Sequence, residues 1–136
     1  MANALYDAGL DAFANGNIDW VNDDIRVILV DTAVYTVDLN NDANLEDVPG
    51  GARVAVSAAS LANKSTAAGV CDADDISFSS VSGDQSEALV LYKHTGNEAT
   101  ATLIAYIDTA TGLPVTPAGT DIDVVWDSGS NKIFKL

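Results

Sequence analysis

The sequence is poor in several residue types on which common functional sites depend. Its 136 residues include one cysteine, one histidine, three prolines and six basic residues. A single cysteine, Cys71, can form neither an internal disulfide nor a cysteine-based zinc site. No basic residue stands beside it in the sequence to stabilise a thiolate, so we expect a small, half-buried residue and not a nucleophile.

Long hydrophobic runs are also missing. No segment approaches the ~20 apolar residues that a membrane-spanning helix requires. The first residues, MANALYDAGLDAF, have neither a basic start nor a long apolar stretch, so we expect no secretory signal. These two absences predict a soluble protein that does not use a membrane as a partner.

Positive charge is scarce, whereas negative charge is abundant. Twenty acidic residues against six basic ones give a net charge of −14 and an isoelectric point near 4.1. Such a surface repels the phosphate backbone of nucleic acids, which proteins bind through Lys and Arg, so we expect no nucleic-acid partner. The acids are 17 Asp and 3 Glu, and this ratio favours turns over helix interiors.

The length and the hydrophobic content of 48% predict one domain over residues 1–136. One helix is predicted over residues 3–16, with Asn3 as its N-cap and Gly16 as its stop. Its apolar stripe is short and built largely from small residues, which indicates a helix lying across a sheet or against a neighbouring subunit. The rest of the chain, residues 25–136, is predicted to be rich in β-strands.

The apolar pattern after the helix changes to the period of two that is typical of strands. Residues 25–32 are almost wholly apolar, as expected for a central strand. Gly, Asn, Asp and Ser cluster between the apolar runs and indicate short turns. We therefore predict a mainly antiparallel β-sandwich or barrel-like domain with one N-terminal helix. The expected strands are 25–32, 33–39, 52–58, 76–81, 87–94, 101–108, 121–127 and 131–136.

Two acidic stretches raise the question of a cation site. In VCDADDISFSS, residues 70–80, the spacing of oxygen ligands and glycine does not match an EF-hand loop, so we expect a solvated turn before a strand. In the loop at residues 40–51 and just before it, Asp38, Asn40 and Asp42 fit the first, third and fifth positions of such a loop. The later positions do not fit. An irregular cation site there competes with a simpler role as turn caps.

No enzyme motif is present. The only histidine, His94, lies at a predicted strand end beside a Gly-containing turn, without a partner arrangement for nucleophilic catalysis, and we expect an exposed turn residue. Asp is too abundant for any carboxylate pair to indicate glycoside hydrolysis. Trp20 and Trp126 are expected to be core or interface anchors rather than platforms for sugar stacking. We expect neither catalysis nor a cofactor.

Four ordered blocks suggest a family. They are GNIDWVNDDIRVILVDTAVYTV, GARVAVSA, GVCDADDISFSSVSGDQSEALVLYKHTG and LIAYIDTATGLPVTPAGTDIDVVWDSGSNKIFKL. Together they resemble a family of small acidic virion structural proteins that tailed bacteriophages encode, and the resemblance covers nearly the whole chain. Two positions depart from it: Cys71 stands where Ala is usual, and His94 where Asp is usual. The resemblance supplies no catalytic or ligand-binding residue to transfer.

The resemblance implies a component of the phage particle, made in the cytoplasm of the host bacterium. High negative charge and a compact β fold favour a capsid decoration (cement) protein on the capsid exterior, bound to the major capsid protein and to copies of itself as a homo-oligomer. A tail, neck or fibre-associated virion protein is the alternative, and a carbohydrate- or receptor-binding β-module is the second alternative. The residues expected to make the contacts belong to the helix, the following loop and the C-terminus: Leu5, Phe13, Trp20, Ile133 and Phe134.

Overall fold

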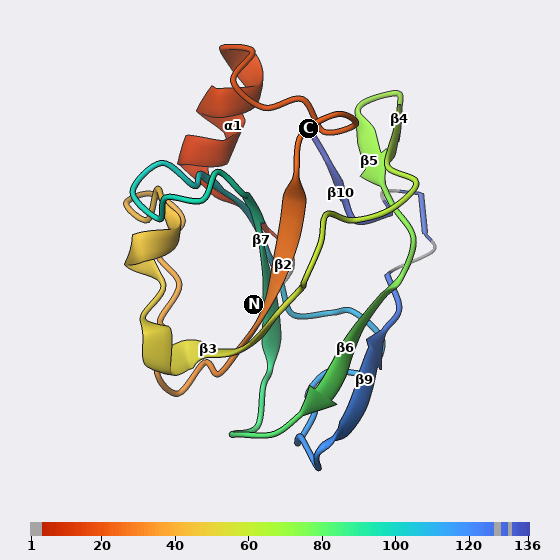
Figure 1. Ribbon diagram of the computed structural model, residues 1–136. Helices are drawn as coiled ribbons and strands as arrows, with labels where there is room; N and C mark the ends of the chain where they lie inside the picture. The colour runs from red at the N-terminus through yellow and green to blue at the C-terminus, as the bar shows by residue number, and fades with distance from the viewer. Residues whose placement is uncertain (1–3, 127–128, 131) are drawn as a thin grey trace.

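The computed structural model describes residues 4–126, 129–130 and 132–136. Within them the chain forms antiparallel sheets and one α-helix near the N-terminus, which confirms the predicted fold class (Figure 1). In chain order the elements are β1 (Ala4–Leu5), α1 (Asp7–Ala14), β2 (Ile25–Val30), the 3-10 helices η1 (Leu45–Asp47) and η2 (Gly50–Ala52), β3 (Arg53–Val56), β4 (Ser65–Ala67), β5 (Val70–Asp72), β6 (Ile76–Val81), β7 (Ala88–Lys93), β8 (Leu103–Ile107), β9 (Thr120–Val124) and β10 (Phe134–Lys135).

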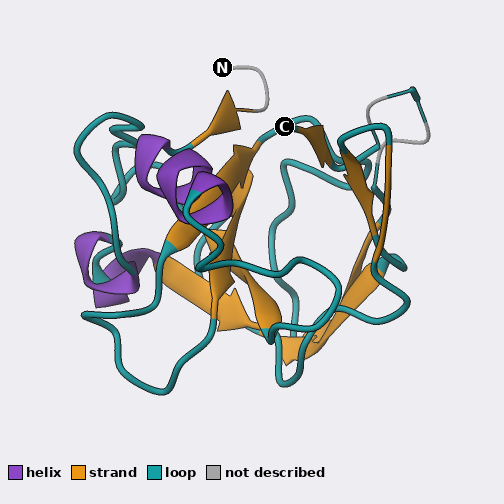
Figure 2. Cartoon of the chain, turned by 90° about the horizontal axis from the view of Figure 1, so that it is seen from above, coloured by secondary structure: helices purple, strands orange, loops and turns teal. Residues whose placement is uncertain are grey.

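The strands form two layers. One layer is a five-stranded sheet in the order β1-β8-β7-β2-β3. The facing layer consists of a three-stranded sheet, β10-β5-β4, and a two-stranded sheet, β6-β9. Figure 2 shows the two layers from above, with the larger sheet beside α1 and the smaller sheets across from it. Apolar side chains from both layers form one core cluster between them, as in a sandwich.

The central strands of the larger sheet are buried on both faces. In β2, Val27 and Leu29 belong to the core between the layers, whereas Ile28 and Val30 belong to a second core on the opposite face. The nearly continuous apolar run of β2 is the sequence signature of such two-sided burial. The expectation of a central strand at this position is therefore confirmed, with an end at residue 30 instead of 32.

The second core lies under the segment between β2 and β3. Tyr35, Leu45, Val48 and Ala52 from this segment are buried there with Tyr6. Residues 33–39, predicted as a strand, form no strand in the structure. Asp31 instead turns the chain, because its carbonyl accepts hydrogen bonds from the amides at positions 34 and 35. The alternation of apolar residues over positions 33–39 still indicated which side chains face inward, since Tyr35 is buried and residues 37 and 39 pack against the same core.

The helix α1 is shorter than predicted. It covers Asp7–Ala14 instead of residues 3–16, and the residue in the N-cap position is Tyr6. The predicted N-cap, Asn3, lies outside the described residues. Ala4 and Leu5 pair with β8 as β1, so a tertiary strand pairing replaces the first turn of the expected helix. The last helical residue is Ala14, two residues before the predicted limit, and the predicted stop, Gly16, follows it with a φ of 75°. No helix in the described part of the chain is long and apolar enough to cross a membrane.

Candidate functional site

The acidic stretch at residues 70–75 runs through the second layer instead of forming a solvated turn. Val70–Asp72 is β5, in which Cys71 is buried, and the chain continues directly toward β6. Within this stretch only Asp74 and Asp75 are exposed. The prediction of a solvated turn was therefore wrong for its first half. The physical reason is non-local: β5 is held in the sheet by β4 on one side and β10 on the other.

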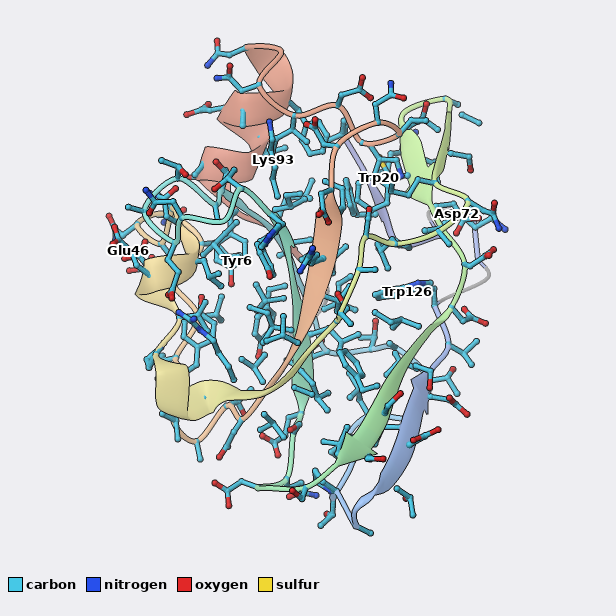
Figure 3. All side chains as sticks on the ribbon, viewed as in Figure 1. Tyr6, Trp20, Glu46, Asp72, Lys93 and Trp126 are labelled. Atoms are coloured by element: carbon cyan, nitrogen blue, oxygen red, sulfur yellow. The ribbon has the colours of Figure 1, made fainter. Side chains whose placement is uncertain are left out.

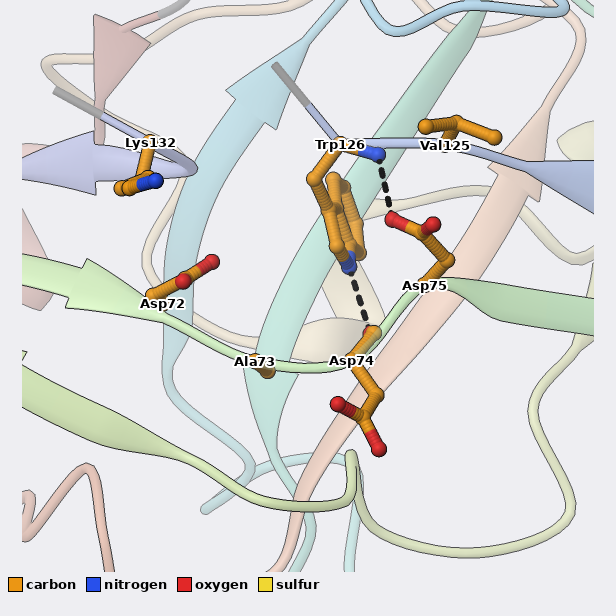
Figure 4. Close-up of a pocket in the computed structure, with 7 residues that line it drawn as sticks. All are labelled: Asp72, Ala73, Asp74, Asp75, Val125, Trp126 and Lys132. Carbon is orange, nitrogen blue, oxygen red and sulfur yellow. Dashed lines mark hydrogen bonds between the residues drawn. The ribbon is translucent and has the colours of Figure 1, made fainter. Parts of the chain in front are cut away.

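Two tryptophans hold the backbone of this stretch where β5 gives way to β6. The Nε1–H of Trp20 donates to the carbonyl oxygen of Asp72 at 3.0 Å, and that of Trp126 donates to the carbonyl oxygen of Asp74 at 2.9 Å. The main-chain N–H of Trp126 also donates to Oδ1 of Asp75 at 2.9 Å (Figure 4). The indole N–H groups thus donate hydrogen bonds to carbonyl groups between β5 and β6, where the strand pairing is interrupted.

Both indoles lie inside the core. Trp20 is 3% exposed and Trp126 is 5% exposed, and Figure 3 shows them on either side of Asp72. Of the two expected roles, core anchor or interface anchor, their burial matches the first. With so little exposed area, neither ring offers a face on which a sugar could stack.

A hollow of about 270 Å³ lies beside these tryptophan contacts (Figure 4). Two of its carboxylates serve the fold: Oδ1 of Asp75 accepts from the main-chain N–H of Trp126, and Oδ2 of Asp74 accepts from Nδ2 of Asn63 at 2.5 Å. The described residues contain no group of three or more His, Cys, Asp or Glu placed to hold a metal ion. The residues that line the hollow are Asp72, Ala73, Asp74, Asp75, Val125, Trp126 and Lys132.

The second acidic loop uses its carboxylates to close a turn. Oδ1 of Asp38 accepts from the amides of Asn40 and Asn41, and Oδ2 accepts from the Asn41 side chain at 2.8 Å. The hydrogen bond from the Asn41 side chain is the main reason that the pKa of Asp38 lies below its usual value. These contacts match the turn-cap interpretation of Asp38, because both of its carboxylate oxygens are already directed at N–H groups, one of which is the main-chain N–H of Asn40.

Asp42 takes part in a buried tyrosine network that the sequence did not reveal. Its Oδ2 accepts from the Tyr35 hydroxyl at 2.7 Å and from the Asp38 amide at 3.0 Å. The Tyr35 hydroxyl lies 2.7 Å from that of Tyr6, far away in the sequence. Burial raises the pKa of both tyrosines well above their usual value, so both phenols stay protonated and hydrogen-bonded. The network ties the loop at residues 35–42 to the larger sheet.

The two nucleophile candidates do not form a site. Cys71 is 1% exposed, so it is fully buried where a half-buried residue was expected, and burial raises the pKa of its thiol to about 11, which disfavours the thiolate. His94 follows β7, donates its main-chain N–H to the carbonyl of Asp24, and packs edge-on against Tyr92 with ring centroids 6.2 Å apart. It is partly buried, whereas an exposed turn residue was expected.

The structure brings the predicted contact residues together, but mostly inside the protein. Phe134 packs against Trp20 with ring centroids 5.2 Å apart and against Phe13 at 6.1 Å. Ile133 is 2% exposed and Phe134 is 7% exposed, so with Trp20 these residues stabilise the fold and present no exposed contact surface. Leu5 and Phe13 are partly buried against the same core. We call α1, residues 15–24, β10 and Leu136 the aromatic end.

Most basic side chains are committed to contacts within the chain. Arg26 pairs with Asp24, Arg53 with Glu98, and Lys93 with Asp23 at 3.0, 2.7 and 3.2 Å. Lys64 donates to the carbonyl of Asp23 and to the Ser60 hydroxyl. Because these cations are held locally, the long-range field of the surface is dominated by its carboxylates.

Comparison with known proteins adds no assignment: no family model matches the sequence, and no curated protein is significantly similar to it.

Proposed function

We propose that this chain is a non-enzymatic structural subunit of a tailed-phage virion, in the role of a capsid decoration protein on the lattice of the major capsid protein. The observation that supports it best is the aromatic end. There, Phe13, Trp20 and Phe134 pack α1, the segment before β2 and β10 against one another, so that this surface is preformed. A preformed, rigid surface loses little conformational entropy on binding, as a protein that adds to a finished lattice requires.

The aromatic end also exposes apolar side chains that the fold does not bury. Leu10 on α1 is 40% exposed, Val21 beside Trp20 is 45% exposed, and Leu136 is 50% exposed. Figure 1 shows α1, the segment that follows it and the C-terminus at the same end of the molecule. We propose that these three residues make the capsid contact in place of the buried residues named from the sequence.

The charge distribution fits the same role. With a net charge of −14 and four of its six basic residues held in local contacts, the surface repels both nucleic acid and other copies in solution. Copies therefore stay apart until a lattice holds them side by side. The contacts between neighbouring copies are then expected to strengthen at high ionic strength, because salt screens this repulsion.

The test is a binding assay with purified capsids from which the protein is absent. The double variant Leu10→Asp, Leu136→Asp removes two apolar contacts and adds two negative charges. We expect its affinity for capsids to fall by about 10-fold or more, because burying a Leu side chain contributes about 1.5–3 kcal/mol. The matched control is Val34→Asp beside η2, which changes an equally exposed residue, at 48%, outside the aromatic end.

Two results would contradict the proposal in different ways. Equal loss of binding in the control variant would reject the aromatic end as the contact surface. Cross-linking mass spectrometry on whole virions tests the role itself. Cross-links to tail, neck or fibre proteins would overturn the decoration role, and absence of the protein from virions would overturn a structural role altogether.

A further inference from the structure

Two neighbouring strand edges in this sandwich share no hydrogen-bond ladder. β3 is the last strand of the five-stranded sheet, and β6 belongs to the separate two-stranded sheet. The strands approach each other near Val54, because a Cβ added at Gly83, just after β6, would lie 3.4 Å from Cγ1 of Val54. Strand edges with free N–H and C=O groups are the sites at which proteins add an extended peptide as a further strand.

The register of β3 shows which of its groups face this opening. Ala55 pairs with Leu29, and the Ser57 amide donates to the carbonyl of Val27. In an antiparallel pair, alternate residues direct their N–H and C=O groups toward the partner strand and away from it. The N–H and C=O of Val56, between these two, therefore point away from β2 and toward β6. Val56 is also 45% exposed.

A groove lies between the two edges. It consists of a hollow of about 200 Å³ between residues 55–58 and 77–79, and a second of about 270 Å³ between residues 57–62 and 74–77. The two hollows share Ser57, Ala58 and Ser77, so they adjoin each other. At the far end the amide of Asp74 donates to the carbonyl of Ala62 at 2.9 Å and closes the groove. The opening is thus bounded, and it suits a short segment.

The charge of the groove specifies the kind of segment. The charged residues among those that line it are Asp74 and Asp75. Each carboxylate accepts a hydrogen bond within the chain, from Asn63 and Trp126 respectively, but neither is in an ion pair within the described part of the chain, so both negative charges remain without a cationic partner there. We infer that this groove binds a short, extended, basic segment of a partner protein, which adds as a strand along β3 with its cationic side chains toward Asp74 and Asp75. Backbone hydrogen bonds supply the affinity of such a site, and side-chain charge its selectivity.

A second copy of this chain is the less suitable occupant. Two copies that each have a net charge of −14 repel one another, and inserting an acidic segment beside Asp74 and Asp75 adds like charges at short range. The groove is independent of the aromatic end and of the virion role, so the inference stands or fails separately from the proposed function.

The experiment uses a defined probe, an acetylated and amidated peptide of nine alternating lysine and valine residues. It is titrated into the ¹⁵N-labelled protein at low salt. We expect saturable NMR shifts of the amides at positions 54–58 and 77–79. Two peptides of the same length serve as controls, and each should bind at least 10-fold more weakly. One has glutamate in place of lysine, and the other is N-methylated at alternate residues so that one of its edges cannot donate hydrogen bonds.

Two variants localise the site on the protein. Val56→Pro removes the outward N–H without removing a ladder bond of the sheet, because those bonds belong to Ala55 and Ser57. Ala58→Lys places a cation in the groove at an exposed position, and it keeps the test valid if the proline variant does not fold. Both should lower the affinity for the lysine peptide at least 10-fold, whereas Val34→Ala should leave it unchanged.

Four outcomes would overturn the inference. They are no saturable binding of the lysine peptide, saturation at a different surface, unchanged affinity in both groove variants, and equal affinity for the glutamate peptide. Dimerisation that Val56→Pro abolishes, without peptide binding, would identify a second copy as the occupant and would also reject the basic partner.

Discussion

The indole ring of Trp20 meets the phenyl ring of Phe134 edge-on, with ring centroids 5.2 Å apart and an interplanar angle of 85°. Edge-to-face pairs of this kind add to the stability that burial alone provides. The contact joins the loop before β2 to β10 near the C-terminus, and Phe13 of α1 packs on the same phenyl ring. One aromatic residue in the last strand therefore positions elements from the opposite end of the sequence.

Replacing this phenyl ring should destabilise the folded protein. Phe134→Ala leaves a cavity among three elements, and we expect the free energy of unfolding to fall by about 3 kcal/mol in urea denaturation. The matched control is Leu136→Ala, which should change it by less than about 0.5 kcal/mol, because this side chain is 50% exposed. Deletion of residues 131–136 removes Ile133 as well and should destabilise the protein more than Phe134→Ala. A truncated protein with an unchanged urea midpoint would show that the aromatic end is not part of the folded core.

The close packing of α1 on β8 depends on Gly9. A Cβ at this position would lie 2.7 Å from the carbonyl oxygen of Leu103, which is too close for α1 to remain in place. Gly9→Ala should therefore lower the free energy of unfolding by about 1–3 kcal/mol, although alanine favours helices. Gly50→Ala is the control, because a Cβ there meets no atom within 4 Å. If Gly9→Ala proved as stable as the control, the helix would have to pack farther from the sheet.

The turn at residues 38–42 should respond to acid. The pKa of Asp38 is lowered mainly by the hydrogen bond from the Asn41 side chain, so the folded pKa lies below the unfolded one. Its contribution to stability is then present above the usual value of 3.8 and is lost as the pH falls through the folded pKa. NMR titration should show that Asn41→Ala raises the pKa of Asp38. Asn40→Ala should leave it unchanged, because Asn40 contributes its main-chain N–H. A pKa that does not move in Asn41→Ala would assign the shift to the backbone hydrogen bonds.

The thiol of Cys71 should be unreactive in the folded protein. Burial raises its pKa to about 11, so little thiolate exists at pH 8 and no reagent can reach it. A maleimide should label Cys71 only after unfolding in urea, as measured by mass spectrometry. In the control Cys71→Ala, Val34→Cys, the new thiol is at a 48% exposed position and should react at once. Rapid labelling of native Cys71 would mean that β4, β5 and β10 open readily.

Local sequence patterns predicted the central part of the fold well. The apolar runs of β2, β7 and β8 required two-sided burial, and all three strands formed within two residues of the expected ends. The strand at residues 76–81 was predicted with its observed limits. These elements are predictable because their burial fixes the hydrophobic pattern residue by residue.

Short strands could not be predicted in the same way. β1, β4 and β5 have two or three residues each, too few for a period to be recognised. In addition, β1 and β5 pair with strands that lie far away in the sequence, β8 and β10. At residues 33–39 the opposite error occurred: a strand was predicted that does not form. These residues alternate like a strand, but the turn at Asp31 and the hydroxyl contact between Tyr35 and Tyr6 hold them outside any sheet.

The sequence by itself determined the class of fold, the acidic surface and the identity of the main core, since these follow from composition and from the period of apolar residues. The tertiary structure alone decided that Trp20, Ile133 and Phe134 lie inside the protein, and that the carboxylates at residues 38–42 and 74–75 accept hydrogen bonds from nearby chain segments. It alone produced the groove between β3 and β6. The reason is physical. The type of a residue determines which groups its side chain can bind, but only the packing of distant segments determines which of those groups lie within reach.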